Sequence, residues 1–192
     1  MKPVKTIGHS NHSIERFVAL LKAAGVERLV DVRSTPWSRR HPQFGQKDLA
    51  RSLAEAGIAY VHEGPALGGK PLVGRPGVAD SYDQLAARPT FKDALDRVIE
   101  KAQETTLCLM CAEKEPLDCH RTVLVSRRLA ERGVSIEHLL ADGGTRSHHE
   151  VEETVLGNDA APDLFEDRAA RLARAWRRLE AKWGRAGTGE GE

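Results

Sequence analysis

Short apolar segments alternate with amphipathic segments over the first 140 residues of this chain. The apolar segments have the length of strands, and the segments between them place apolar residues at helical spacing. Strands separated by helices are typical of parallel pairing, because parallel neighbours need a crossover connection. The expected strands are 4–7, 28–32, 58–61, 106–110 and 134–140, and helices are expected to begin near residues 14, 47, 90 and 118.

This order predicts an α/β fold with a mainly parallel open sheet of about five strands and helices on both faces. Three-layer folds of the Rossmann-like or flavodoxin-like kind have this arrangement. We expect a single domain over 1–160, an Arg-rich amphipathic helix over 161–184 packed on it or on a partner, and a disordered tail over 185–192. The apolar stripe of that helix is compatible with a homodimer, and it consists of Phe165, Leu172, Trp176, Leu179 and Trp183.

Composition narrows the class of protein. With 192 residues, 40% of them hydrophobic, and a formal net charge of +1, the chain is typical of a globular protein without wholesale attraction to nucleic acid. Its apolar runs are shorter than the roughly 18 to 20 residues that a membrane span needs, so we expect no membrane association and a cytoplasmic location. An odd count of three cysteines favours reduced thiols over a disulfide framework.

Polar, Gly-rich or Pro-rich segments follow each predicted strand. Because the carboxyl ends of parallel strands meet at one edge of a sheet, we expect these segments to share a rim where ligands bind. Four of them contain the candidate site residues, which are His9, Ser10 and Asn11, then Asp31, Arg33 and Arg39, then Gly68, Gly69 and Lys70, and last Cys111, Glu113, Cys119, His120 and Arg121.

Arginines and a helix start indicate an anionic ligand at this rim. Arginine guanidinium groups match phosphate and carboxylate with two hydrogen bonds, and a helix N-terminus attracts anions. Two adjacent glycines would let backbone amides approach the ligand closely. We therefore assign substrate binding to His9, Ser10, Asn11, Arg33, Arg39, Gly68, Gly69, Lys70 and Arg121. The alternative is that the arginines pair with nearby carboxylates and stiffen the loops.

The segment from Cys111 to Arg121 has the reactive groups. A thiol near a helix N-terminus and beside cationic residues tends toward thiolate, so either cysteine is a candidate nucleophile. Glu113 and His120 are candidate general acids or bases, and Asp31 could bind a ribose hydroxyl or orient a histidine. The catalytic candidates are therefore Cys111, Glu113, Cys119, His120 and Asp31. The alternative for the cysteines is burial as small apolar residues.

Metal binding is not expected from this spacing, and the cofactor is unknown. Cys-x7-Cys-His is not a usual structural zinc pattern. If Cys119 and His120 were adjacent residues of one helix, their side chains would point about 100° apart.

Several separated motifs resemble the DUF488 family, over a range from about Lys5 to Leu156. They are Gly8-His-Ser-Asn11, Asp31-Val-Arg-Ser-Thr-Pro36 with Ser38-Arg39 and Phe44, Leu67-Gly-Gly69, Met110-Cys-Ala-Glu113, Cys119-His-Arg121, and Asp142-Gly-Gly144 followed by His149. This family is one of unknown function, so the resemblance supports the fold and the choice of site residues but implies no substrate.

We therefore predict an enzyme, a hydrolase or transferase with Cys/His/Glu chemistry, that acts on an anionic substrate such as a phosphorylated or nucleotide-like molecule. The alternative is a non-catalytic protein that binds anions or nucleic acid, in which the same rim recognises a backbone and the Arg-rich helix adds contacts.

Overall fold

The computed structural model describes residues 1–69, 81–157 and 166–186. They form two compact units, Met1–Arg146 and Ser147–Glu192. The expected domain boundary at residue 160 and part of the expected tail lie outside the described residues. None of the helices within the described ranges has the length and apolar character needed to cross a bilayer.

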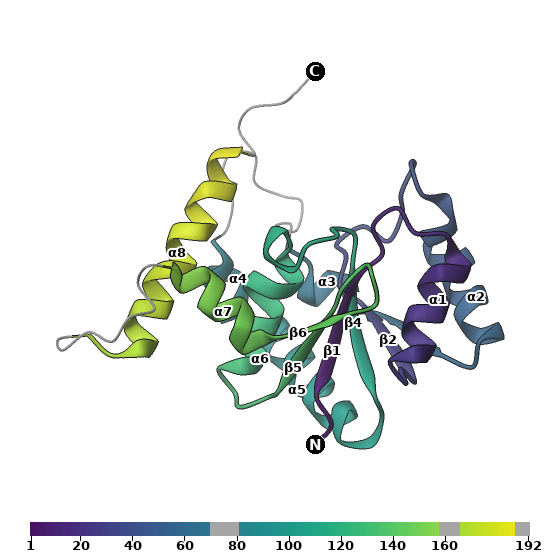
Figure 1. Cartoon of the computed structure of the whole chain (residues 1–192), viewed down its shortest axis with the longest axis horizontal. Helices are drawn as coiled ribbons and strands as arrows, with labels where there is room; N and C mark the ends of the chain where they lie inside the picture. The colour runs from purple at the N-terminus through teal and green to yellow at the C-terminus, as the bar shows by residue number, and fades with distance from the viewer. Residues whose placement is uncertain (70–80, 158–165, 187–192) are drawn as a thin grey trace. The chain divides into compact units, whose positions relative to one another are not determined.

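The first unit is built around a six-stranded sheet in the order β3-β2-β4-β1-β5-β6 (Figure 1). The strands are β1 Val4–Gly8, β2 Arg28–Asp31, β3 Ala59–His62, β4 Leu107–Cys111, β5 Ile136–Leu139 and β6 Thr145–Ser147. β1 pairs in parallel with β4 and β5, and β2 pairs in parallel with β3 and β4. The parallel α/β fold is therefore confirmed, with a short sixth strand that the sequence pattern did not indicate.

The order of the strands places β4 between β1 and β2. It differs from the 3-2-1-4-5-6 and 2-1-3-4-5 orders of the two doubly wound folds named above. Because the crossovers after β2 and β4 run to opposite sides, the loops that follow these two strands leave the sheet in opposite directions. In open α/β sheets this is the place where ligands bind, outside the carboxyl ends of the strands.

Helices cover both faces of this sheet (Figure 1). α1 (Ile14–Ala23) and α2 (Gln46–Glu55) pack Phe17, Leu21 and Leu53 into one apolar core. α5 (Pro89–Glu104) packs Phe91 and Leu95 into the other core, which α3 (Gly64–Leu67), α4 (Tyr82–Ala87) and α6 (Arg127–Ala130) also reach. β4 alternates strictly between the cores, because successive side chains of a strand point to opposite faces. Leu107, Leu109 and Cys111 face one core, while Cys108 and Met110 face the other.

Several local predictions need correction. The first helix begins as expected, with Ser13 accepting a hydrogen bond from the Arg16 amide at 3.2 Å. The Gly- and Pro-rich segment after β3 was expected to be a loop, but Pro65 at the first turn allows the short helix α3. The helix expected from Asp118 starts only after His120, and its first part, Arg121–Ser126, is π-helical.

The described part of the second unit contains the helices α7 (His148–Leu156) and α8 (Arg168–Ala186). α7 begins with a capping box between Ser147 and Glu150. α8 covers most of the Arg-rich helix expected over 161–184. Trp176 is buried and its ring lies parallel to that of His148, with centroids 6.1 Å apart.

Candidate functional site

The loops after β1, β2 and β4 are joined by hydrogen bonds at the carboxyl edge of the sheet. The amides of His9 and Ser10 donate to the carbonyls of Cys111 and Ala112, both at 2.9 Å. His120 Nε2 lies 2.9 Å from the carbonyl oxygen of Val32. The structure thus brings most of the described site candidates to one rim, where they form two clusters of different chemistry.

The first cluster, here called the Asp31 network, contains Asp31, Arg33, Tyr60 and His9. The buried Asp31 carboxylate accepts from Arg33 Nε at 2.9 Å, from Arg33 Nη2 at 2.6 Å and from the Tyr60 hydroxyl at 2.8 Å. The Arg33 amide donates to the same carboxylate at 3.0 Å, and Arg33 Nη2 also donates to the Phe44 carbonyl at 2.9 Å. Burial and the charge of Asp31 raise the pKa of Tyr60.

His9 closes this network on one side. Its ring stacks on Phe44 with centroids 4.3 Å apart, and its Nε2 lies 3.3 Å from Arg33 Nη1. Burial lowers the pKa of His9 to about 4, so the imidazole is neutral at physiological pH. Donors and acceptors in the Asp31 network therefore satisfy one another, as they do in a structural polar cluster.

The second cluster, here called the Cys111 cluster, contains Cys111, Glu113, Cys119 and His120. The expectation of reduced thiols is wrong for two of the cysteines, because the structure pairs Cys111 with Cys119 in a disulfide. A Glu113 carboxylate oxygen contacts the Cys111 sulfur, and His120 Nδ1 lies 3.9 Å from the Cys119 sulfur. One ligand atom from each of the four residues lies within 4.8 Å of the others, so this group could hold a metal ion.

A turn in the backbone makes this convergence possible. Cys119 has an extended conformation, with φ −139° and ψ 138°, and it precedes the helix rather than belonging to it. The expectation that Cys119 and His120 point about 100° apart is therefore wrong, because it assumed that both residues lie in one helix. Burial lowers the pKa of His120.

Arg121 holds the loop that connects the two cysteines. Its guanidinium is fully buried, and it donates to the carbonyls of Glu113 at 2.6 Å and Lys114 at 3.2 Å. Burial lowers the pKa of Arg121 to about 10, so the group stays cationic at neutral pH. Arg33 and Arg121, two of the three arginines expected to bind an anion, thus already have protein acceptors. Arg33 pairs with a carboxylate, as in the alternative given for these arginines, whereas Arg121 binds backbone carbonyls.

The two adjacent glycines serve side-chain packing. A Cβ atom on Gly69 would lie 2.6 Å from Cβ of His120, and one on Gly68 would overlap the Ser34 hydroxyl. Their lack of a side chain lets the segment after α3 approach the His120 ring. The structure thus gives these glycines a packing role against His120 and Ser34, and their predicted approach to a ligand stays a prediction.

A family model described as a domain of unknown function, DUF488, matches residues 13–128. The chain belongs to the DUF488 family. The match contains the Asp31 network except His9, and it contains the whole Cys111 cluster, whereas the motifs at Gly8 and Asp142 lie outside it. No curated protein and no solved structure matches the chain.

The remaining candidates of this DUF488 chain lie around the two clusters or outside the described residues. Ser10 has a positive φ of 47°, and its hydroxyl donates to Asn11 Oδ1 at 3.3 Å. Arg39 is exposed and lies over the Trp37 ring, 6.0 Å from its centroid. Lys70 lies outside the described residues.

Two cations that sequence reasoning did not assign lie near His12 of the DUF488 chain. The pKa of His12 is lowered first by burial and then by the charges of Arg16 and Lys114, so both cations are near this imidazole. Arg16 comes from α1 and Lys114 from the loop between the two cysteines, and both are exposed. Arg16 and Lys114 are not part of a recognisable motif, and they are far apart in the sequence. Sequence reasoning could not assign them to a site, because only the fold brings them together.

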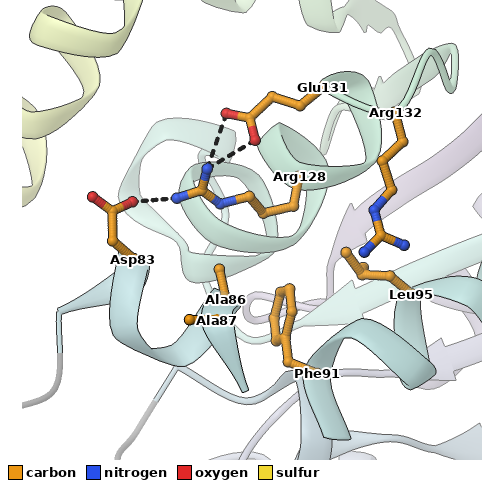
Figure 2. Close-up of a pocket in the computed structure, with 8 residues that line it drawn as sticks. All are labelled: Asp83, Ala86, Ala87, Phe91, Leu95, Arg128, Glu131 and Arg132. Atoms are coloured by element: carbon orange, nitrogen blue, oxygen red, sulfur yellow. Dashed lines mark hydrogen bonds and ion pairs between the residues drawn. The ribbon is translucent and has the colours of Figure 1, made fainter. Parts of the chain in front are cut away.

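Two pockets of the first unit contain no residue of the two clusters, although Arg16 lines one of them. One pocket of about 380 Å³ is formed by α4, α5 and α6 (Figure 2). Its wall includes Arg128, which is paired with Asp83 and Glu131. Another pocket, of about 410 Å³, includes Lys5, Leu20 and Leu139. Because neither contains a residue of the two clusters, the rim remains the candidate site of the DUF488 chain.

Proposed function

We propose that this DUF488 protein is an enzyme that acts on an anionic substrate, phosphorylated or nucleotide-like, at the carboxyl rim of the sheet. The Cys111 cluster supplies the reactive groups. The observation that supports an anionic substrate is the position of Arg16 and Lys114, whose charges both act on His12. Hydrogen bonding between Ser10 and Ala112 joins the loop that contains His12 to the loop that contains the cluster.

In the described part of the chain, Arg16 and Lys114 have fewer protein partners for their positive charges than the buried Arg33 and Arg121. Among the described residues, Arg16 Nη2 donates to a neutral backbone carbonyl, that of Asp142 at 3.1 Å, which does not cancel its positive charge. Lys114 is exposed. A phosphate group that contacts these exposed side chains would gain charge-assisted hydrogen bonds without breaking the bonds of Arg33 or Arg121.

Three arginines of the Arg-rich helix α8 are less available to nucleic acid than the sequence alone suggests. Arg168 pairs with Glu152 at 3.1 Å and with Glu153 at 2.8 Å, and Arg174 pairs with Glu166. Arg171 is buried. These three arginines are paired or buried and so are less available to a phosphate backbone, whereas Arg177 and Arg178 of the same helix are exposed.

Calorimetric titration of the full chain with inorganic pyrophosphate and with AMP tests the anion site. Lys114→Gln and Arg16→Gln should each weaken binding about tenfold, corresponding to ~1.4 kcal/mol. Lys92→Gln, an exposed lysine on α5, is the matched control and should leave the affinity unchanged. Equal affinities for all three variants and the unsubstituted protein would contradict the anion site.

Turnover is tested separately with a panel of phosphate esters, phosphodiesters and nucleotides at low salt. Glu113→Gln should lower kcat on any substrate that is consumed, because it removes a carboxylate from the reactive cluster. Tight anion binding without turnover across the panel would indicate the non-catalytic alternative, in which case the proposal of an enzyme fails.

A further inference from the structure

We propose that the reduced Cys111 cluster is a transition-metal site of the zinc class. Cys111, Cys119 and His120 are its fixed ligands, and Glu113 is an exchangeable fourth ligand. This inference goes beyond the proposed function, because it concerns metal binding by the protein itself and does not depend on the identity of the substrate.

The cluster gathers electron-pair donors with few hydrogen-bond donors to match them. Two sulfurs, a carboxylate oxygen and an imidazole nitrogen lie within 4.8 Å of one another. The amide of Arg121, 3.3 Å from the Cys119 sulfur, donates to this group from the backbone. Placing several lone pairs together is unfavourable unless a cation or protons lie between them, and a metal ion satisfies all four atoms at once.

His120 has the hydrogen bond that a metal-binding histidine needs. Its Nε2 lies 2.9 Å from the Val32 carbonyl, which can only accept, so Nε2 has the proton and Nδ1 has a free lone pair. Metal-bound histidines almost always donate their other ring N–H to an acceptor in this way. Gly69 packs against the same side chain and so fixes where the ring lies.

One distance in the cluster is close to that expected between two ligands of one metal ion. Tetrahedral ligands with bonds of about 2.0 to 2.3 Å lie roughly 3.6 Å from each other. His120 Nδ1 is 3.9 Å from the Cys119 sulfur. The Cα atoms of Cys111 and Cys119 are 7.5 Å apart, wider than the 4.4 to 6.8 Å usual for disulfides. A backbone this wide suits two reduced sulfurs that bind one central atom.

Conversion of the disulfide into this site is a balanced reaction. Two thiol molecules of an external reductant supply two electrons and two protons, the bond between the sulfurs of Cys111 and Cys119 breaks, and the reductant leaves as its own disulfide. A divalent metal ion then replaces the two thiol protons, which pass to water.

The surrounding charges also suit a divalent ion. Two thiolates and the Glu113 carboxylate have three negative charges, and the metal together with the buried Arg121 guanidinium supplies three positive charges. Arg121 also fixes the backbone of Glu113 and Lys114. Arg121 is thus a positioning residue that holds the ligand loop in place.

Exposure distinguishes the four ligands. Cys111 and Cys119 are buried and His120 is half-buried, whereas Glu113 is exposed. Two cysteines and a histidine with an accessible fourth position form a known ligand set of catalytic zinc sites, in which water or substrate occupies the open position.

Cobalt titration of the full chain, reduced with a phosphine under anaerobic conditions, tests the site. Co²⁺ reports thiolate ligands through its charge-transfer absorption, and we expect one equivalent to bind and one equivalent of Zn²⁺ to displace it. Cys111→Ser and Cys119→Ser should lose the thiolate absorption. Glu113→Gln, a change at an exposed residue, should keep the absorption and weaken binding by about tenfold.

Cys108→Ala is the matched control, because Cys108 is buried in the core on the other face of the sheet. This variant should keep full cobalt absorption, and protein with an intact disulfide should show none. Circular dichroism checks the fold of every variant. The proposal is overturned if reduced, folded protein binds no cobalt, or if the absorption persists without Cys119. Neither result depends on substrate binding, so failure here leaves the anion site to its own test.

Discussion

The Asp31 network and the Cys111 cluster lie at the same rim, and both contain buried polar groups and a histidine. In the Asp31 network each acceptor faces a donor, and the carboxylate receives four hydrogen bonds from Arg33 and Tyr60. In the Cys111 cluster, acceptors face other acceptors. This difference shows that the presence of reactive residue types does not by itself identify a ligand-binding or catalytic site. The balance of donors and acceptors separates a polar cluster that stabilises the fold from one that can bind a ligand.

Asp31→Asn is the strongest test of the structural side of this comparison. The buried Arg33 guanidinium would lose its charge partner, and breaking a buried pair from one side costs about 3 to 5 kcal/mol. Urea unfolding should show this loss of stability. Asp48→Asn, in the exposed pair between Asp48 and Arg51, is the control and should change the free energy of unfolding by less than about 1 kcal/mol. Similar values for both variants would mean that Asp31 is not a structural anchor.

A change of pH gives a second test of the comparison between structural and ligand-binding polar groups. His148 is a buried histidine that, unlike His120, does not belong to a cysteine cluster. Burial lowers its pKa to about 4 from an ordinary value of 6.5. The unfolded chain therefore binds the proton more readily, and stability should fall as pH drops from 6.5 toward 4, by about 3 kcal/mol in total. The nearby Glu152 carboxylate, 3.9 Å from Nε2, is the charged group closest to offsetting this loss.

Unfolding by urea across this pH range measures the effect. His148→Gln should reduce the slope of stability against pH, while His149→Gln, at an exposed neighbour, should keep it. The slope that remains is expected from His9, whose pKa burial also lowers to about 4. Neither change should alter cobalt binding. An unchanged slope in His148→Gln would mean that another group causes the loss of stability in acid. Loss of cobalt binding in the same variant would mean that His148, a histidine without cysteines in its cluster, binds the metal.

Much of the fold follows from local pattern, and the parts that do not are set by long-range packing. The spacing of apolar residues predicts the strands and helices. The first helix begins after Ser13, as predicted from the ability of a serine hydroxyl to accept a hydrogen bond from the first turn. The position of β4 between β1 and β2 depends on which strands meet after collapse, which no local segment encodes. The sixth strand is only three residues long and too short for a period to show.

The same limit applies to the site. Strand ends identify the rim, and the residues from Cys111 to His120 do converge there. Whether Arg33 is free or paired depends on Asp31, Tyr60 and Phe44, which meet it only in the folded chain. The ligand geometry of Cys119 depends on one extended residue ahead of a π-helical turn, and helix propensity does not reveal it.

Two glycines give a matched pair of smaller changes, one at each cluster. A Cβ on Gly64 would overlap the Arg33 carbonyl, whereas a Cβ on Gly69 would press on the His120 side chain. Backbone yields less than a side chain, so Gly64→Ala should cost up to about 3 kcal/mol and Gly69→Ala closer to 1 kcal/mol. Only Gly69→Ala should weaken cobalt binding, because it displaces a metal ligand. Weaker binding in Gly64→Ala as well would mean that the two clusters are not independent.

Tyr60→Phe is the smallest of these changes. It removes one of the four donors to Asp31 and leaves the three from Arg33, so the carboxylate stays paired. A hydrogen bond to a charged group contributes about 1.5 kcal/mol at the low end of its range, and the half-buried position of Tyr60 favours that end. Urea unfolding should therefore show a loss about a third of that in Asp31→Asn, with cobalt and pyrophosphate affinities unchanged. A loss as large as that of Asp31→Asn would mean that the phenol, and not Arg33, keeps the carboxylate in place, because a network held by one ion pair tolerates the removal of a neutral donor.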